Sequence, residues 1–189
     1  MKRTIQYQNF KNIYVALFLG ATLFFSCEND IEKVNLYVDK AKLPEQSAEN
    51  VEIVYTEDAE PKLRLKAKIF ERFKDEKKTY INFPEGIYVT FYTKNREIQS
   101  TLKANRAIYY ESEKLWEAHE DVVAVNEDGD ILNTELLYWD ENTEKIYSDK
   151  HVRIRTKDEI LFGEGFESNQ EFTKYKIKKL TGTVSLADE

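Results

Sequence analysis

The chain has 189 residues, a formal net charge of −7 and 41% hydrophobic residues, which suits one ordinary folded domain. The acidic balance argues against a nucleic-acid partner, which would require a basic surface. The 12 tyrosines and 11 phenylalanines, in a chain with little helical periodicity, favour β-strands.

Residues 1–26 are predicted to be a signal sequence. They carry bases but no acid, and their apolar run from Ile13 to Phe25 is short for a membrane span. The run ends at Cys27, the only cysteine, and resembles a bacterial lipoprotein signal, in which the thiol takes a diacylglycerol and the chain is cut just before it. We therefore expect Cys27 to be a lipid attachment site. The alternative is an uncleaved membrane anchor with an incidental cysteine.

Residues 27–48 are polar and contain Pro44, and they are predicted to form a lipid-anchored tether to a folded domain of residues 49–186. Either kind of anchor places this domain outside the cytoplasm. Residues 28–189 hold 25 Lys and Arg against 35 Asp and Glu, a net charge of −10.

The folded domain reads as short strands joined by polar turns. Apolar and polar residues alternate in segments 51–56, 63–70 and 87–93, and polar breaks recur along the rest of the chain. This pattern indicates an all-β sandwich or barrel. Asp128-Gly129 is the strongest hairpin signal, because glycine tolerates the positive φ of a primed turn.

A hairpin repeats at roughly 30 residues. The segments "TLKANRAIYYESEKLWEAHEDVVAV" and "ILNTELLYWDENTEKIYSDKHVRI" share the order of their residue types, and Leu102 and Leu132 are 30 residues apart. The first unit has one residue more, which a β-bulge at Asn105–Arg106 would absorb. A weaker third copy begins at Leu161, and an earlier one contains Pro84, which marks an edge or a bulge.

Alternation assigns an inner face that is apolar but carries a row of small residues. In the second unit it puts Leu136 and Tyr138 inside and Leu137 and Trp139 outside. A row of small residues fits either a taper in a close-packed core or a groove left open for an apolar ligand. The candidate groove positions are Leu102, Ala104, Ala107, Tyr109, Trp116, Ala118, Val122, Leu132, Thr134, Leu136, Tyr138, Ile146, Ser148, Val152, Ile154 and Gly163.

Catalytic motifs do not emerge from the sequence. The two histidines, His119 and His151, have no metal-ligand spacing, and no serine lies in a nucleophile elbow. Gly163-Glu164-Gly165 lacks the third glycine of a phosphate loop. We therefore expect no catalytic residue, no metal site, no cofactor and no enzymatic activity.

Several segments, in this order and spacing, resemble the LptC family of lipopolysaccharide-transport proteins, which shares its fold with LptA and the periplasmic part of LptD. They are the two repeat units, "FGEGFES" and the closing "YKIKKLTGTV", and together they cover about residues 65–186. The resemblance implies an antiparallel twisted β-jellyroll, open along one side, whose apolar interior holds lipid acyl chains. Many LptC proteins keep an N-terminal transmembrane helix, and the Cys27 signal departs from that pattern.

The resemblance also implies partners and a location. LptC proteins stand in the periplasm, accept lipopolysaccharide from an inner-membrane ABC transporter and pass it to an LptA-like partner of the same fold. Strand addition would join such domains, so we expect a partner edge at the last strand, with Tyr175, Ile177 and Val184, and another in residues 51–70. The alternative is that the domain's own loops cover both edges.

A second function remains open from the residues alone. A membrane-anchored β-sandwich could bind glycans or serve as an assembly module without carrying lipid. A glycan binder needs exposed aromatic side chains on one sheet, whereas a lipid carrier needs an apolar inner face with small residues along it.

Overall fold

The computed structural model describes residues 43–74 and 78–186. The predicted signal sequence and Cys27 therefore lie outside the described residues. All regular elements in these ranges are strands, and the first begins three residues before the predicted domain boundary at residue 49. The strands are β1 (Gln46–Glu57), β2 (Glu60–Lys74), β3 (Thr79–Phe83), β4 (Ile87–Tyr92), β5 (Ile98–Ala104), β6 (Arg106–Tyr110), β7 (Leu115–Val125), β8 (Ile131–Asp140), β9 (Lys145–Arg155), β10 (Glu159–Asn169) and β11 (Tyr175–Ser185).

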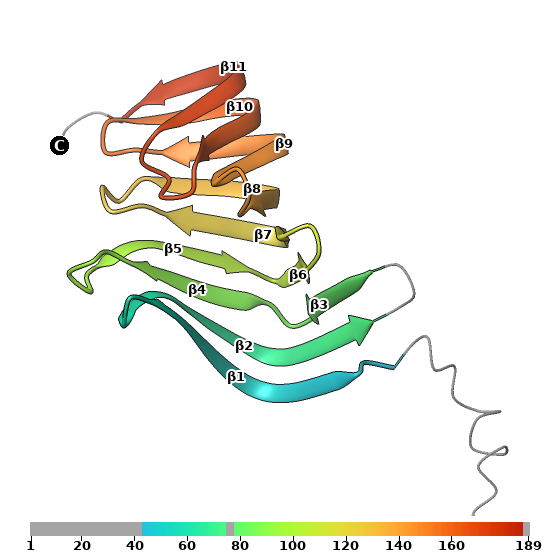
Figure 1. Ribbon diagram of the computed structural model, residues 1–189. Coiled ribbons are helices and arrows are strands. Elements are labelled where there is room, and N and C mark those ends of the chain that lie inside the picture. The colour runs from blue at the N-terminus through green and yellow to red at the C-terminus, as the bar shows by residue number, and fades with distance from the viewer. Residues whose placement is uncertain (1–42, 75–77, 187–189) are drawn as a thin grey trace, which may run out of the picture. The chain divides into compact units, whose positions relative to one another are not determined.

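The strands form one antiparallel sheet that follows the chain almost in order (Figure 1). The sheet runs β11-β10-β9-β8-β7-β5-β4-β2, β1 pairs with β2, and β3 and β6 fill the remaining positions between β2 and β7. Among the described strands, β1 and β11 each pair on one side only, so the sheet does not close into a barrel. This is an all-β, antiparallel, twisted β-jellyroll that is open along one side, as the family resemblance implied.

Two of the long strands are interrupted, and the interruptions lie next to each other. β3 and β4 are separated by residues 84–86, where Pro84 was expected to mark an edge or a bulge. β5 and β6 are separated by Asn105, so the predicted irregularity at Asn105–Arg106 is confirmed. Arg106 is exposed and Ala107 is fully buried, as the bulge requires.

The interruptions continue across the sheet as a line that we call the crease. The Asn105 amide N–H donates to the carbonyl of Glu120 at 3.0 Å, and both Glu120 and Asp121 have left-handed φ angles of 66° and 51°. Further along, the pairing register shifts between β8 and β9 and between β9 and β10, where Gly165 has a φ of +74°. Local breaks in the ladder let each strand bend. The one sheet therefore folds so that its two halves face each other.

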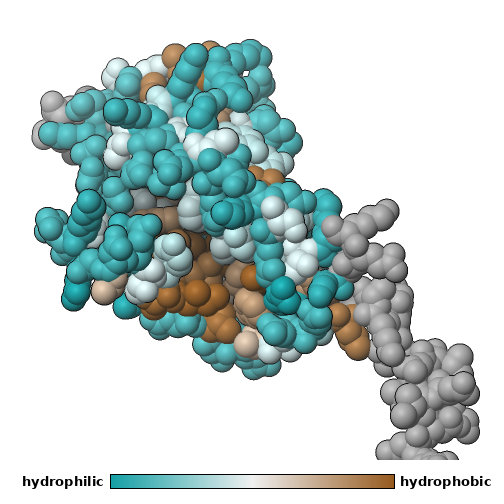
Figure 2. All heavy atoms as spheres, viewed as in Figure 1, coloured by the Kyte–Doolittle hydropathy of each residue, from teal (hydrophilic) through white to brown (hydrophobic). Residues whose placement is uncertain are grey.

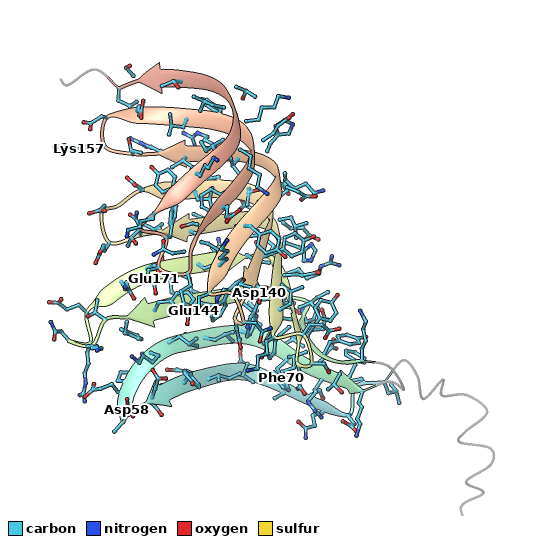
Figure 3. The ribbon with its side chains drawn as sticks, turned by 45° about the horizontal axis from the view of Figure 1, so that its top comes forward. Asp58, Phe70, Asp140, Glu144, Lys157 and Glu171 are labelled. Atoms are coloured by element: carbon cyan, nitrogen blue, oxygen red, sulfur yellow. The ribbon has the colours of Figure 1, made fainter. Side chains whose placement is uncertain are left out.

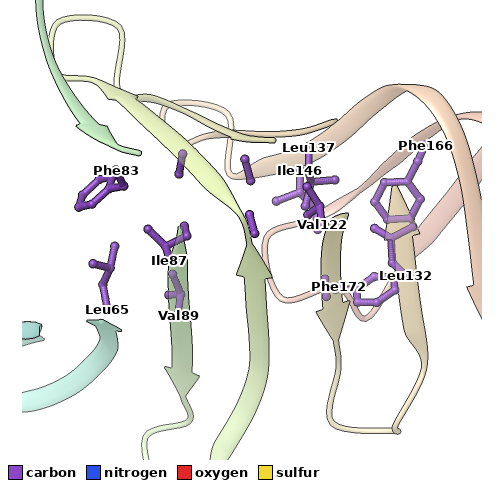
Figure 4. Close-up of a cluster of buried hydrophobic side chains, with 14 of the residues drawn as sticks. Leu65, Phe83, Ile87, Val89, Val122, Leu132, Leu137, Ile146, Phe166 and Phe172 are labelled. Carbon is purple, nitrogen blue, oxygen red and sulfur yellow. The ribbon is translucent and has the colours of Figure 1, made fainter. Parts of the chain in front are cut away.

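The core lies between these halves. The aromatic rings of Phe91 in β4 and Trp139 in β8, strands that are not neighbours in the sheet, meet edge to face at 5.6 Å. Figure 4 shows the buried apolar side chains gathered from both halves. The most enclosed of them are Phe83, Phe166, Phe172, Leu132, Leu137, Ile154 and Val122.

The hairpin turns match the predicted repeat. The turn between β7 and β8 contains Gly129 with a φ of +83°, and Asn126 closes it by accepting the Asp130 amide N–H at 2.8 Å on its side-chain oxygen. Lys114 and Glu144, 30 positions apart, end the two equivalent turns with left-handed φ angles of 52° and 53°. The repeat is thus one hairpin, as expected from Asp128-Gly129 and the spacing of the leucines.

The crease is expected to tolerate a side chain poorly at Gly86. Gly86 has a φ of +86°, and an added Cβ would lie 2.5 Å from the carbonyl oxygen of Ala104. We expect Gly86→Ala to lower the free energy of unfolding by about 2–4 kcal/mol, from backbone strain plus this contact.

Gly129→Ala is the matched control, because its φ is +83° and nothing lies within 4 Å of the added Cβ. This variant should lower the free energy of unfolding by about 1 kcal/mol, from backbone strain alone. Urea unfolding of both variants measures the difference. Equal losses would show that crowding at the crease contributes nothing.

Candidate functional site

A narrow apolar cavity of about 40 Å³ lies between the two halves of the folded sheet. One side is formed by β2, β4 and β5, and the other by β6, β7 and β8. Glu117 is the only charged residue among those that line the cavity. The lining residues are Leu63, Leu65, Ile87, Val89, Phe91, Leu102, Ala107, Trp116, Glu117, Ala118, Leu137 and Trp139.

The cavity opens towards a wider, polar mouth of about 450 Å³ at the ends of the hairpins. Leu63, Phe91 and Trp139 line both spaces, so they mark the junction between them. The mouth also carries Lys62 and Lys94, with acidic and amide side chains around them. Figure 2 shows apolar surface within a hollow on this face of the molecule. The site is therefore partly polar at its entrance and apolar inside.

Stacked aromatic rings form one wall of the cavity. Trp116 stacks on Tyr109 at 4.4 Å between centroids and on Trp139 at 6.2 Å. At the end of this wall the Glu141 carboxylate accepts a 2.8 Å hydrogen bond from the Trp116 indole N–H and a 3.4 Å bond from the Tyr109 hydroxyl. Burial, and then the charge of Glu141, raises the pKa of the Tyr109 phenol to about 12. Glu141 thus fixes the orientation of both rings.

The interior near β9 to β11 is mostly filled, apart from a small cavity of about 30 Å³ beside Phe172. Phe166 and Phe172 pack edge to face at 5.7 Å, and Leu132 and Ile154 beside them are fully buried. Phe172 comes from the turn between β10 and β11, and its carbonyl accepts a 3.1 Å bond from the Asn126 side chain. In this half, the small residues lie in a close-packed core. That was one of the two explanations that the sequence left open for them.

The turn that carries Phe172 also contacts the turn between β8 and β9. The backbone N–H of Gln170 donates to the backbone carbonyl of Glu144 at 3.0 Å. Figure 3 shows Glu144 and Glu171 close together at the ends of these hairpins. The contact closes the interior on that side, and the opening remains beside β2 and β4.

Thr134 and Ser148 were predicted to line a groove, but they lie at the crease. They are 7% and 0% exposed, respectively, and their hydroxyls are 3.3 Å apart. The Thr134 hydroxyl donates to the carbonyl of His151 at 2.9 Å, and the Ser148 hydroxyl donates to the carbonyl of Leu136 at 2.6 Å. These side chains therefore satisfy carbonyls where the register shift breaks the β8–β9 ladder.

Alternation along β8 fails past Thr134, because the register shifts there. Leu137 and Trp139, expected outside, line the cavity. Tyr138, expected inside, instead pairs with Glu117 and Tyr147 across the sheet and stacks on the Tyr147 ring at 5.0 Å. This ring pair is the usual cross-strand packing of aromatic residues.

The structure places the predicted groove residues in four kinds of position. Leu102, Ala107, Trp116 and Ala118 line the cavity, and Tyr109 stands behind Trp116. Thr134, Leu136 and Ser148 surround the crease, while Tyr138 faces outwards. The rest are buried: Ala104, Val122, Leu132, Ile146, Val152, Ile154 and Gly163.

Sequence reasoning missed the residues at the junction. Leu63 and Phe91 were recognised as parts of alternating strands but not as site residues. Trp139 was assigned to the wrong face. Phe172 was hidden in a turn, and a lone aromatic residue within the polar stretch "SNQEFTK" is the signal that could have found it.

The predicted partner edge is the outer strand of the sheet. β11 pairs with β10 alone among the described strands. Tyr175 and Ile177 pack against the core, whereas Val184 and Leu180 are 52% and 56% exposed. At the opposite edge, Ile53, Val54 and Tyr55 of β1 are exposed as well.

Across residues 43–74 and 78–186, no group of three His, Cys, Asp or Glu side chains is placed to hold a metal ion. The same ranges contain no helix that is both long and apolar enough to cross a membrane.

Comparison with known proteins adds one result. A family model described as "Lipopolysaccharide-assembly, LptC-related" matches residues 13–184. A search of curated proteins found no match.

The raised pKa of Tyr109 predicts a loss of stability at high pH. The folded-state pKa of about 12 lies above the ordinary value of 10.0, so the folded state holds this proton more tightly than the unfolded state does. The contribution to stability is complete below pH 10 and is lost as the pH rises towards 12. Denaturant unfolding should show a steeper fall in this window for the native chain than for Tyr109→Phe. Identical slopes would contradict the assignment.

Proposed function

The chain belongs to the LptC-related family of lipopolysaccharide-assembly proteins, and from this premise we propose that it holds lipopolysaccharide by its acyl chains between the two halves of its folded sheet. It acts there as a non-enzymatic carrier. The single observation that carries the proposal is the apolar cavity that opens at Leu63, Phe91 and Trp139 into a polar mouth. An amphiphile has the same division into apolar and polar parts.

Burial of apolar surface supplies the driving force for such binding. Each methylene removed from water contributes about 0.8 kcal/mol, so several buried acyl chains need no further chemistry. The cavity of about 40 Å³ is much smaller than the mouth of about 450 Å³ and too small to hold an acyl chain as it stands. Loading therefore requires β2 and β4 to separate from Trp116, Leu137 and Trp139. This side can move apart because the sheet is open and β1 has no neighbour beyond it among the described strands.

Photo-crosslinking tests this groove directly. We expect a photoreactive amino acid at Trp139 or Leu63 to form adducts with lipopolysaccharide in cells, because both positions line the cavity and its mouth. The matched controls are the sequence neighbours Tyr138 and Arg64, whose side chains point to the other face. Mass spectrometry or an antibody to lipopolysaccharide detects the adducts.

Equal labelling at the inner and outer positions, or no labelling at either inner position, would reject the groove. A filling variant gives an independent check. Ala118→Leu adds apolar volume to the cavity wall, so it should reduce adduct formation at Leu63 while the chain still unfolds cooperatively.

We further propose where the protein stands and how lipid passes through it. It is held in the periplasm by lipid on Cys27 in the inner membrane, takes lipopolysaccharide from an inner-membrane ABC transporter beside β1 and β2, and hands it to an LptA-like protein beside β11. Strand addition at an open edge is a general mode of docking. The two edges also differ in charge, which favours distinct partners at each.

The charge difference lies in the outer strands themselves. β1 carries three acids and no base, with Glu49, Glu52 and Glu57. β11 carries three lysines and no acid, with Lys176, Lys178 and Lys179. A partner strand with acidic side chains would therefore fit β11, and the like-charged approach of another β11 would be disfavoured.

Charge reversal on β11 tests this docking edge. Lys179 already pairs with Glu164 at 2.8 Å, so we change Lys176 and Lys178 instead. Lys176→Glu with Lys178→Glu should weaken binding to the LptA-like protein of the same organism on the order of tenfold, as measured by surface plasmon resonance.

The control carries Lys74→Glu with Lys114→Glu, two exposed lysines that lie outside β11 and outside the mouth, and has the same net charge. It should bind the partner as the native chain does. Equal weakening in both variants would assign the effect to total charge and would reject β11 as the docking edge.

A further inference from the structure

The chain has two tryptophans, and their indole N–H groups differ. The N–H of Trp116 donates to Glu141 at 2.8 Å. The indole nitrogen of Trp139 is inaccessible to solvent and has no hydrogen-bond partner among the described residues. The two rings stack on each other, with 6.2 Å between centroids and 17° between planes. Of the two neighbouring indole N–H groups in this wall, that of Trp116 is therefore hydrogen-bonded and that of Trp139 is not.

A buried donor without an acceptor costs free energy, and such groups are rare in folded proteins. The ring of Phe91, which meets Trp139 edge to face at 5.6 Å, offers at most a weak acceptor. The fold gives Glu141 to Trp116 and gives no carboxylate or carbonyl to Trp139. This unmet donor is the kind of group that a ligand satisfies.

Its position indicates which part of a ligand would meet it. Trp139 lines the apolar cavity, a second small cavity of about 30 Å³ beside Phe172, and the polar mouth. It therefore stands at the level where polar surroundings give way to apolar ones. In an acylated amphiphile, the ester or amide carbonyl lies at that same level, between the head group and the hydrocarbon chain.

We propose that the Trp139 indole N–H donates a hydrogen bond to an acyl ester or amide carbonyl of the bound lipid. The donor makes the site selective for acyl lipids over amphiphiles that carry plain alkyl chains. A carbonyl suits it better than a charged group does, because the surrounding side chains are apolar and would not compensate a desolvated charge. This inference rests on the proposed lipid groove and specifies the chemistry of its ligand.

Competition between two matched amphiphiles tests the proposal on the full-length chain. Lauroyl sucrose and dodecyl maltoside both join a disaccharide to a chain of the same length, but only the first has an ester carbonyl. Each is titrated below its micelle concentration against lipopolysaccharide cross-linking from a photoreactive residue at Leu63. We expect the ester to halve the labelling at about tenfold lower concentration than the alkyl glycoside, the ratio that one net hydrogen bond gives.

Trp139→Phe should abolish this preference, so that both amphiphiles compete at the same concentration. Tyr138→Phe is the control, because it removes a hydroxyl donor at the neighbouring position, whose ring stacks on Tyr147 on the opposite face of the strand. It should leave the ratio unchanged. The unliganded variants give a second readout: the thermal midpoint should fall further for Trp116→Phe than for Trp139→Phe, since only the former breaks a hydrogen bond.

The outcomes separate this inference from the proposed function. Absence of labelling at Leu63 in the native chain would reject the groove itself. Labelling with equal competition by both amphiphiles would keep the groove and overturn the donor role, as expected if a trapped water alone satisfies the indole. A preference that survives Trp139→Phe would overturn it as well.

Discussion

The crease that crosses the sheet is the constraint on which the rest of the structure depends. A flat sheet of these strands would leave one apolar face in water. Bending each strand at neighbouring positions turns that face inwards on itself. Gly86, Asn105, the left-handed pair Glu120 and Asp121, and Gly165 provide the bends. Because the ladder is broken there, the Thr134 and Ser148 hydroxyls must satisfy nearby carbonyls.

The two regions of the interior differ in what fills them. Beside β9 to β11, the Phe172 turn is inserted between the halves and packs on Phe166, and a cavity of about 30 Å³ lies beside Phe172. Beside β2 and β4, the halves meet across small side chains such as Ala107 and Ala118, and a narrow apolar space remains. One folded sheet thus combines a packed end with an end where an apolar space remains. Under the proposed function, the packed end would keep the domain folded while the other end widens to admit a ligand.

Aromatic residues set the chemistry of the open end. Glu141 orients Tyr109 and Trp116, and Trp116 in turn supports the ring of Trp139 at the junction with the mouth. The rings give the wall a large apolar surface with few rotatable bonds, so little conformational entropy is lost when a chain packs against them. Within this wall, the indole N–H of Trp139 has no hydrogen-bond partner among the described residues. The site thus combines a partly polar entrance with an apolar interior, the division that the proposed amphiphilic ligand would share.

The sequence by itself determined the strands, their hairpin turns, the repeat and the interruption at Asn105, because alternation and turn residues are local properties of the chain. It also determined that the inner face is apolar. Only the tertiary structure decided where that face is filled and where it stays open. A register shift of one residue exchanges the two faces of a strand, so Trp139 lines the cavity and Tyr138 lies on the opposite face. Phe172 fills the other end because a turn contacts strands that are distant in the sequence, which no local pattern encodes.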